Sequence, residues 1–214
     1  MNALFSALAS FLLFSSMAAH AQELSREQAA QALSKADAQT RRDGVSRLGE
    51  VGTMADATLL VTALRDADED VRDRAEKAMW RIWARSGDQE VDKLYQLGVE
   101  QMNGGDLRQS IDTFTRIIEL KPDFAEGWNK RATLYFLVGD LRKSLADCDE
   151  VIKRNPYHFG ALAGYAQIYV RLGYYDRALE YSRRALKINP NMDAVRRNID
   201  LIDGLVEQRR RQTI

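Results

Sequence analysis

The sequence predicts an all-α protein, a right-handed α-solenoid of stacked helical hairpins. Prolines and glycines mark a 34-residue repeat through the middle of the chain: Pro122, Pro156 and Pro190, and Gly105, Gly139 and Gly173. This length accommodates a helix, a turn, a second helix and a connector. A glycine can end the first helix in a left-handed conformation, and a proline, which lacks an N–H, ends the second. Because one hairpin cannot bury its own apolar face, three stacked hairpins are expected to share a core.

Residues 1–21 have the features of a secretory leader. They contain no Lys, Arg, Asp or Glu, carry an apolar run over residues 3–13, and end in the small-x-small pattern Ala19, His20, Ala21. We therefore expect a signal peptide cleaved after Ala21, a periplasmic or secreted protein, and no stable membrane insertion after cleavage. A retained membrane anchor is the alternative that the sequence leaves open, although the segment is short and serine-rich for a spanning helix.

Residues 22–87 contain a second, weaker repeat with a period of 31 residues. It aligns Arg41 with Arg72, and Asp66 and Asp68 lie in the turn before the second copy. This arrangement resembles the short HEAT-type repeat. The resemblance implies that the turn carboxylates cap the next helix and pair with its arginine, so we expect a HEAT-like helical segment at the N-terminal side.

Local signals mark the start and the end of this segment. Ser25 and Gln28 form a capping-box pattern that begins a first helix. Trp80 and Trp83 lie three residues apart on one helical face, just before the domain boundary at residues 86–88. Aromatic residues at this spacing more often pack against a neighbour than bind a ligand. We expect them to attach the segment to the first 34-residue unit.

The three 34-residue units lie within residues 88–192. Their bounds are 91–124, 125–158 and 159–192. In the second unit, the apolar, small and turn positions are Trp128, Ala132, Tyr135, Gly139, Asp140, Leu141, Ser144, Cys148, Val151 and Pro156. This pattern resembles the tetratricopeptide repeat. With the leader in front, the chain also resembles exported bacterial proteins that contain such repeats.

The family resemblance implies a superhelix in which the first helix of each hairpin lines a groove. Four positions of each first helix face that groove: Asp92, Tyr95, Val99 and Met102; Glu126, Asn129, Thr133 and Phe136; Gly160, Ala163, Gln167 and Val170. These side chains are mostly apolar or neutral, which suits an extended peptide or an amphipathic helix. Apart from Asp92, Glu126 and Gly160, they form the predicted partner-binding groove. The alternative is that the groove holds the chain's own terminal helix.

The same resemblance allows a comparison with co-chaperone repeats that clamp the C-terminal carboxylate of heat-shock chaperones. Those domains use two lysines, two asparagines and an arginine. The corresponding residues here are Tyr95, Val99, Lys130, Gly160 and Gly164. Only Lys130 is cationic, so we expect the carboxylate clamp to be absent.

Composition gives no support to catalysis or nucleic-acid binding. After the leader, the chain has one histidine, His158, and one cysteine, Cys148, too few for a structural zinc site. His158 has no nucleophile at motif spacing. The acidic run at residues 66–70 lacks the glycine and glutamate of a calcium loop. Thirty-one basic residues balance 31 acidic ones, so no overall field attracts nucleic acid. We expect neither an enzyme, nor a cofactor, nor a metal site.

Residues 193–214 are predicted to form a C-terminal capping helix followed by a basic tail. Apolar residues recur at helical spacing at Val195, Ile199, Ile202 and Val206, and arginines occupy positions 209–211. The complete pattern predicts an exported adaptor or scaffold that binds a protein or peptide partner, in cell-envelope assembly or maintenance. A structural oligomerisation module and an enzyme with an unrecognised site are the alternatives.

Overall fold

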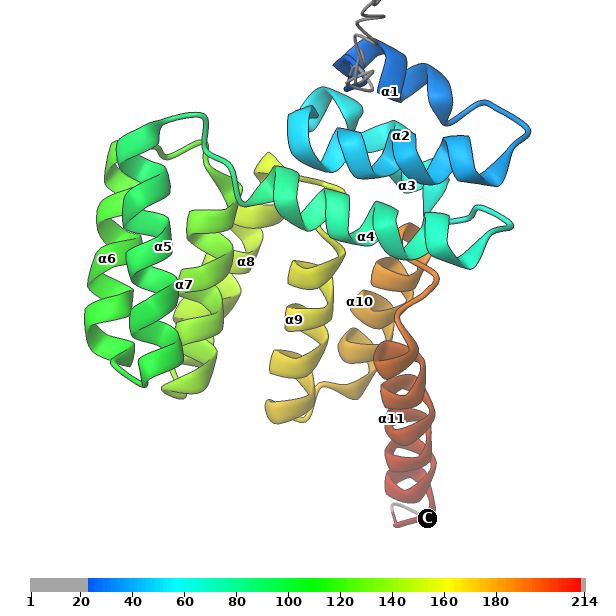
Figure 1. Ribbon diagram of the computed structural model, residues 1–214. Helices are drawn as coiled ribbons and strands as arrows, with labels where there is room; N and C mark the ends of the chain where they lie inside the picture. Colours follow the sequence, from blue (N-terminus) through cyan, green and yellow to red (C-terminus); the bar gives the residue numbers. More distant parts are fainter. Residues whose placement is uncertain (1–22, 213–214) are drawn as a thin grey trace, which may run out of the picture.

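The structure, a computed structural model, describes residues 23–212, which contain helices and loops only (Figure 1). The helices are α1 (Arg26–Ala32), α2 (Ala38–Val51), the 3₁₀ turn η1 (Met54–Asp56), α3 (Ala57–Ala63), α4 (Glu69–Trp83), α5 (Gln89–Gly104), α6 (Leu107–Leu120), α7 (Ala125–Leu137), α8 (Leu141–Arg154), α9 (Phe159–Arg171), α10 (Tyr175–Ile188) and α11 (Asp193–Gln212). The predicted all-α solenoid is confirmed. The predicted leader and its cleavage site after Ala21 lie outside the described residues.

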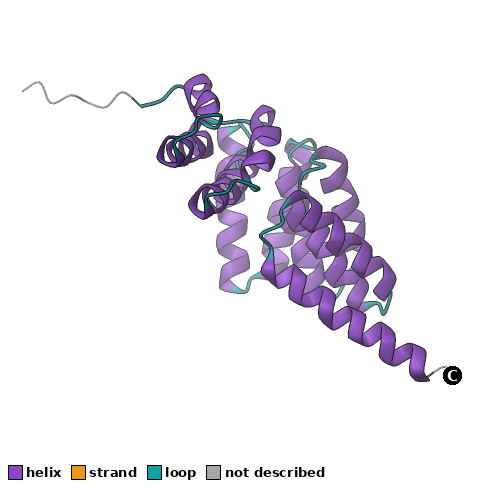
Figure 2. Ribbon diagram, turned by 90° about the vertical axis from the view of Figure 1, so that its right-hand side faces the viewer, coloured by secondary structure: helices purple, strands orange, loops and turns teal. Residues whose placement is uncertain are grey.

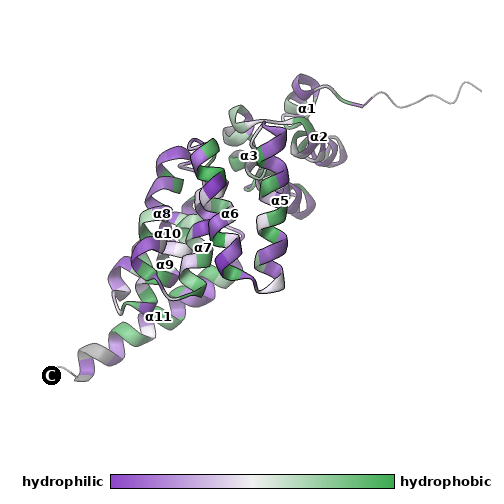
Figure 3. Cartoon of the chain, turned by 90° about the vertical axis from the view of Figure 1, so that its left-hand side faces the viewer, coloured by the Kyte–Doolittle hydropathy of each residue, from purple (hydrophilic) through white to green (hydrophobic). Residues whose placement is uncertain are grey.

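The three 34-residue units form the hairpins α5–α6, α7–α8 and α9–α10. The turns between the two helices of each hairpin contain Gly105, Gly139 and Gly173, whose φ angles of 86°, 86° and 75° are left-handed. A residue with a Cβ is strained in that region, which is why glycine occupies these turns. Hydrophobic and hydrophilic residues alternate along the helices (Figure 3), so each hairpin has apolar stripes to bury. Neighbouring hairpins contact one another through α6 with α7 and α8 with α9.

Helices α1 to α4 form a separate N-terminal unit of two further hairpins. Its second helices, α2 and α4, pack against each other, and Leu48, Leu60, Val71 and Met79 are fully buried between the helices. The expected capping box is present, because the Ser25 side chain accepts from the Gln28 N–H and the Gln28 side chain accepts from the Ser25 N–H.

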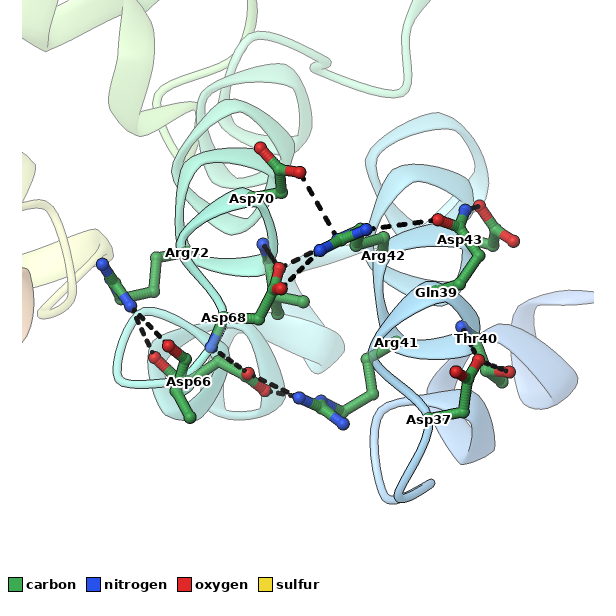
Figure 4. A network of polar contacts seen from close by, with 12 residues as sticks. Asp37, Gln39, Thr40, Arg41, Arg42, Asp43, Asp66, Asp68, Asp70 and Arg72 are labelled. Carbon is green, nitrogen blue, oxygen red and sulfur yellow. Dashed lines mark hydrogen bonds and ion pairs between the residues drawn. The ribbon is translucent and has the colours of Figure 1, made fainter.

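Arginine–aspartate pairs connect the two copies of the 31-residue repeat (Figure 4). Arg41 makes two hydrogen bonds to Asp66, at 2.7 and 2.8 Å, and Arg42 Nε lies 2.9 Å from Asp68 Oδ1. Asp68 also caps α4 through the N–H of Val71. The expectation that these carboxylates pair with Arg72, the arginine of the helix that follows their turn, was wrong. Arg72 instead donates to the backbone carbonyls of residues 66 and 67, because its helix begins directly after that turn.

The N-terminal unit packs across the connectors of the later repeats, with α4 running transversely over them (Figure 1). Trp80 and Trp83 contact His158 and Phe159 at the start of the third repeat, with ring centroids 4.4 to 5.4 Å apart. The prediction that the tryptophans attach to the first unit was therefore wrong. The chain changes direction after α4, where Gly87 adopts φ 77°, so α4 and α5 do not continue one stack.

Further contacts extend this seam between the N-terminal unit and the repeats. Asn189 Nδ2 donates to Glu76 Oε2 at 2.9 Å, and Asn191 Nδ2 donates to the carbonyl of Leu64 at 2.8 Å. Arg65 donates to the carbonyl of Ile188 at 3.1 Å. The unit is thus tied to the connectors on both sides of the third repeat.

Helix α11 packs against α10 and extends away from the rest of the molecule (Figure 2). Val195 and Ile202 are buried, and the helix continues through the arginines at 209–211, which were expected to form a tail. Across residues 23–212, no helix combines the length and the apolar character needed to cross a membrane.

The arginine pairs predict that the N-terminal unit is sensitive to acid. The hydrogen bonds from Arg42 lower the pKa of Asp68 to about 2 from 3.8. A folded-state pKa below the unfolded value contributes stability that is present above about pH 4 and lost as pH falls toward 2. Circular-dichroism melts should therefore show a falling midpoint over this window.

Asp68→Asn keeps a side chain that caps helices equally well, so it removes mainly the charge pair. We expect it to lower the midpoint at neutral pH and to weaken the acid dependence. Asp73→Asn, at an exposed position of the same helix, is the control and should leave the dependence unchanged. Equal acid profiles for Asp68→Asn and the parent chain would contradict the assignment.

Candidate functional site

The inner face of the repeats, which we define as the surface formed by α7, α9 and α11, contains two hollows. The larger has a volume of about 390 Å³ and lies between α9 and α11, with Phe136 of α7 at its edge. The smaller, about 60 Å³, lies between α7 and α9. Both are lined by Phe136 and Gln167, so they adjoin one another.

Six of the nine predicted groove residues lie on this inner face. Thr133 and Gln167 are exposed, whereas Asn129, Phe136, Ala163 and Val170 are partly buried. All six line one or both hollows. Tertiary structure thus brings the α7 and α9 positions together, and it adds residues of α10 and α11 that helix-position reasoning did not include: Ser182, Val195, Asn198, Leu201, Ile202 and Leu205.

The predicted positions on α5 behave differently, because Tyr95 is buried with 6% of its surface exposed. Its ring packs edge-on against Phe114 and Phe124, with both centroids 5.9 Å away. Val99 and Met102 are partly buried against the same cluster. The prediction that Tyr95 faces an open groove was wrong, since its ring completes the core of the first hairpin.

A buried carboxylate lies behind the Asn129 end of the inner face. Glu126 accepts hydrogen bonds from His158 Nε2 at 2.9 Å and from Asn129 Nδ2 at 3.1 Å, and Lys130 Nζ lies 3.3 Å away. Burial alone would raise the pKa of Glu126, but the hydrogen bond from His158 and the nearby Lys130 outweigh it and hold the pKa below its usual value. Glu126 was predicted to face the groove, and it is instead a structural hub.

His158 connects this hub to the N-terminal unit. Its Nδ1 accepts the Ala161 N–H at 3.0 Å and so caps α9, which leaves Nε2 to carry the proton donated to Glu126. The imidazole stacks on Trp83 with an interplanar angle of 21°. On the neighbouring residue, a Cβ added at Gly160 would lie 2.5 Å from Trp80. Gly160, another predicted groove position, is therefore covered by α4.

Two observations on the described residues bear on catalysis. Within residues 23–212, no group of three or more His, Cys, Asp or Glu is placed to hold a metal ion. Cys148 is buried beneath the smaller hollow, and burial together with Asp147 and Asp149 raises the pKa of its thiol to about 12. A thiol with so high a pKa is not a nucleophile at neutral pH.

Comparison with known proteins identifies the repeats. Two family models, both described as Tetratricopeptide repeat, match residues 95–157 and 160–192. A TPR repeat-containing protein of Rhizobium etli is 35% identical over 126 residues, which are 59% of this chain and 62% of the relative. Residues 95–157 and 160–192 are therefore tetratricopeptide repeats, and the chain resembles other proteins that contain them. It spans less than two thirds of that relative, and 19% and 40% of two other curated relatives.

Solved structures share this fold at low sequence identity. The Sgt2 TPR domain from Aspergillus fumigatus superposes with a TM-score of 0.55 at 21% identity, covering 58% of this chain and 83% of that one. The first TPR of Spaghetti (RPAP3), solved bound to the HSP90 peptide SRMEEVD, gives a TM-score of 0.54 at 19% identity, covering 56% of this chain and 94% of that one. At these identities the likeness shows the fold alone.

Because the buried Glu126 carboxylate bonds His158 and Asn129 and lies next to Lys130, we expect its truncation to cause a large loss of stability. Glu126→Ala leaves the buried His158 without its partner and opens a void, so we expect the free energy of unfolding to fall by about 3 kcal/mol or more. Urea denaturation followed by circular dichroism measures it. Glu100→Ala, at an exposed site on α5, is the control and should change it by no more than about 0.5 kcal/mol. Similar losses for both variants would remove the hub from this account.

Proposed function

We propose that this protein is an exported adaptor whose inner face binds a segment of a protein partner, in the assembly or maintenance of the cell envelope. The observation that carries the proposal is the pair of adjoining hollows on that face, lined mainly by apolar side chains of α7, α9 and α11. A helical repeat array presents such a surface without reactive groups, and an apolar groove of this kind suits a peptide or a helix.

The repeat family supports binding as the mode of action. The RPAP3 repeat domain was solved with a peptide bound, so a scaffold of this fold can hold a peptide. Within residues 23–212 the Cys148 thiol is buried and no group of three or more His, Cys, Asp or Glu is placed to hold a metal ion, which favours a scaffold over an enzyme. Binding of a protein or peptide, rather than turnover of a substrate, is the function that this site supports best.

The side chains present do not favour capture of a C-terminal carboxylate. Lys130 is the cation at the clamp positions, and it already lies 3.3 Å from the Glu126 carboxylate. Tyr95 is buried, and Gly160 is covered by Trp80. We therefore propose that the partner is recognised through apolar side chains within its sequence.

Site-specific crosslinking tests the inner face. A photoreactive benzoylphenylalanine in place of Thr133, which is exposed beside the smaller hollow, should yield a defined adduct with one partner in cells. The matched control is the same group at Ala146, an exposed position on α8 away from both hollows. We expect at least tenfold more adduct from position 133. Equal labelling from the two positions would show that the inner face is not the binding surface.

Export is tested by the N-terminus of the native protein. If residues 1–21 are a cleaved leader, peptide mass spectrometry of protein from the soluble envelope fraction should find a chain that begins at Gln22. Replacing Ala19 and Ala21 by bulky residues should block cleavage, because signal peptidase requires small residues there. Intact chains that begin at Met1 in the cytoplasmic fraction of unaltered cells would contradict export.

A further inference from the structure

One position of the repeat carries a progressively smaller side chain along the array. Phe114, Cys148 and Ser182 lie 34 residues apart on α6, α8 and α10, and all three are buried. In the first repeat the Phe114 ring fills the space beside α5, so closely that a Cβ at Gly98 would lie 2.8 Å from it. The space beside Cys148 is the smaller hollow of the inner face, of about 60 Å³. The space beside Ser182 is the larger hollow, of about 390 Å³, which we call the cavity. The cavity therefore exists where a small residue replaces the filling side chain.

The Ser182 hydroxyl is a buried polar group without a hydrogen-bond partner in the described part of the chain. The residue is 1% exposed. Two other buried serines of the second helices are satisfied: Ser110 donates to the Gly98 carbonyl at 2.8 Å, and Ser144 donates to the Ala132 carbonyl at 2.7 Å. A buried hydroxyl without a partner costs free energy, so an arrangement in which the Ser182 side chain turns toward the cavity and bonds a group held there is favoured.

The rest of the lining is uncharged and mostly apolar, with the amides of Gln167 and Asn198 as its other polar side chains. Ala163, Ala166, Val170 and Ile202 contribute aliphatic surface, and Leu201 remains 67% exposed at the opening. A charged side chain in this cavity would lose its hydration without meeting an opposite charge. An aliphatic side chain or a phenylalanine would leave the Ser182 hydroxyl unpaired. The lining thus selects a side chain with a large apolar body and a neutral polar tip.

We propose that the cavity between α9 and α11 is an anchor site for a tyrosine side chain of the bound partner segment, with the phenol hydrogen-bonded to Ser182. This inference rests on the proposed function and specifies its ligand. A phenol both donates and accepts, which matches a serine hydroxyl in either orientation, and its ring suits the aliphatic walls. The cavity volume of about 390 Å³ is many times the volume of about 30 Å³ that one water molecule occupies in the liquid, so the cavity has room for a whole aromatic side chain.

A matched pair of probes tests the site on the full chain. N-acetyl-tyrosine amide and N-acetyl-phenylalanine amide differ by the one hydroxyl that Ser182 would bond. In titrations followed by methyl NMR, binding of the tyrosine probe should shift the resonances of Val170, Val195 and Ile202, which line the cavity. We expect the tyrosine probe to bind at least threefold more tightly than the phenylalanine probe.

Two substitutions of Ser182 separate filling of the cavity from loss of the hydroxyl. Ser182→Phe copies the residue found at the same position of the first repeat, so its ring should occupy the part of the cavity beside α9 and reduce binding of both probes at least tenfold. Ser182→Ala keeps the cavity open, and the affinities of the two probes should converge. Ala146→Ser, at an exposed position of α8 outside both hollows, is the control and should leave both affinities unchanged.

Each result decides for or against the anchor site. Equal binding of the two probes to the parent chain, or tyrosine selectivity that persists in Ser182→Ala, would overturn it even if Ser182→Phe does not fold. If the adduct at position 133 forms equally well in Ser182→Phe cells, the inner face binds a partner but the tyrosine anchor is wrong. If the tyrosine probe binds as expected while position 133 gives no adduct, the anchor site stands and the adaptor proposal fails.

Discussion

The stacking of Trp83 on His158 is the contact on which the arrangement of the two halves depends. The ring centroids lie 4.4 Å apart, and the same imidazole bonds the buried Glu126 of α7 and caps α9. One side chain therefore joins α4, α7 and α9. In a repeat array each hairpin contacts only its neighbours, so the interface between two adjacent hairpins is all that resists their bending against each other. A transverse helix fastened to the connectors adds a constraint that the repeats alone do not provide.

This constraint also shapes the surface that remains available for binding. Tyr95 of α5 completes the core of the first hairpin and Trp80 covers Gly160 at the start of α9, so neither of these predicted groove positions is open to a ligand. The inner face is instead open toward α11, where Ser182 stands in place of a larger residue. The repeat position held by Phe114, Cys148 and Ser182 thus belongs to a filled core in the first repeat and to the lining of a cavity in the third. A fold with three stacked hairpins can tolerate one open position when the others are filled.

Several features were predictable because they depend on neighbouring residues. The 34-residue spacing of glycines and prolines located the hairpins, and the left-handed glycines confirm the turn chemistry. Ser25 forms the capping box that its sequence indicates. Periodicity also placed Thr133, Phe136 and Gln167 on a common face. The burial of Glu126 was not predictable, because nothing near it in the chain indicates that it bonds His158, which in turn stacks on Trp83. The unpaired hydroxyl of Ser182 likewise depends on where α11 lies.

The amino-acid sequence by itself determined the helices, their turns and the repeat, because backbone hydrogen bonds and apolar periodicity act over a few residues. Tertiary structure decided which face of the array stays open. That outcome depends on contacts between residues distant in the chain, such as Trp80 with Phe159, and on the change of direction at Gly87. No local pattern encodes the path that follows such a turn, so helix positions alone place a groove on α5 that the folded chain closes.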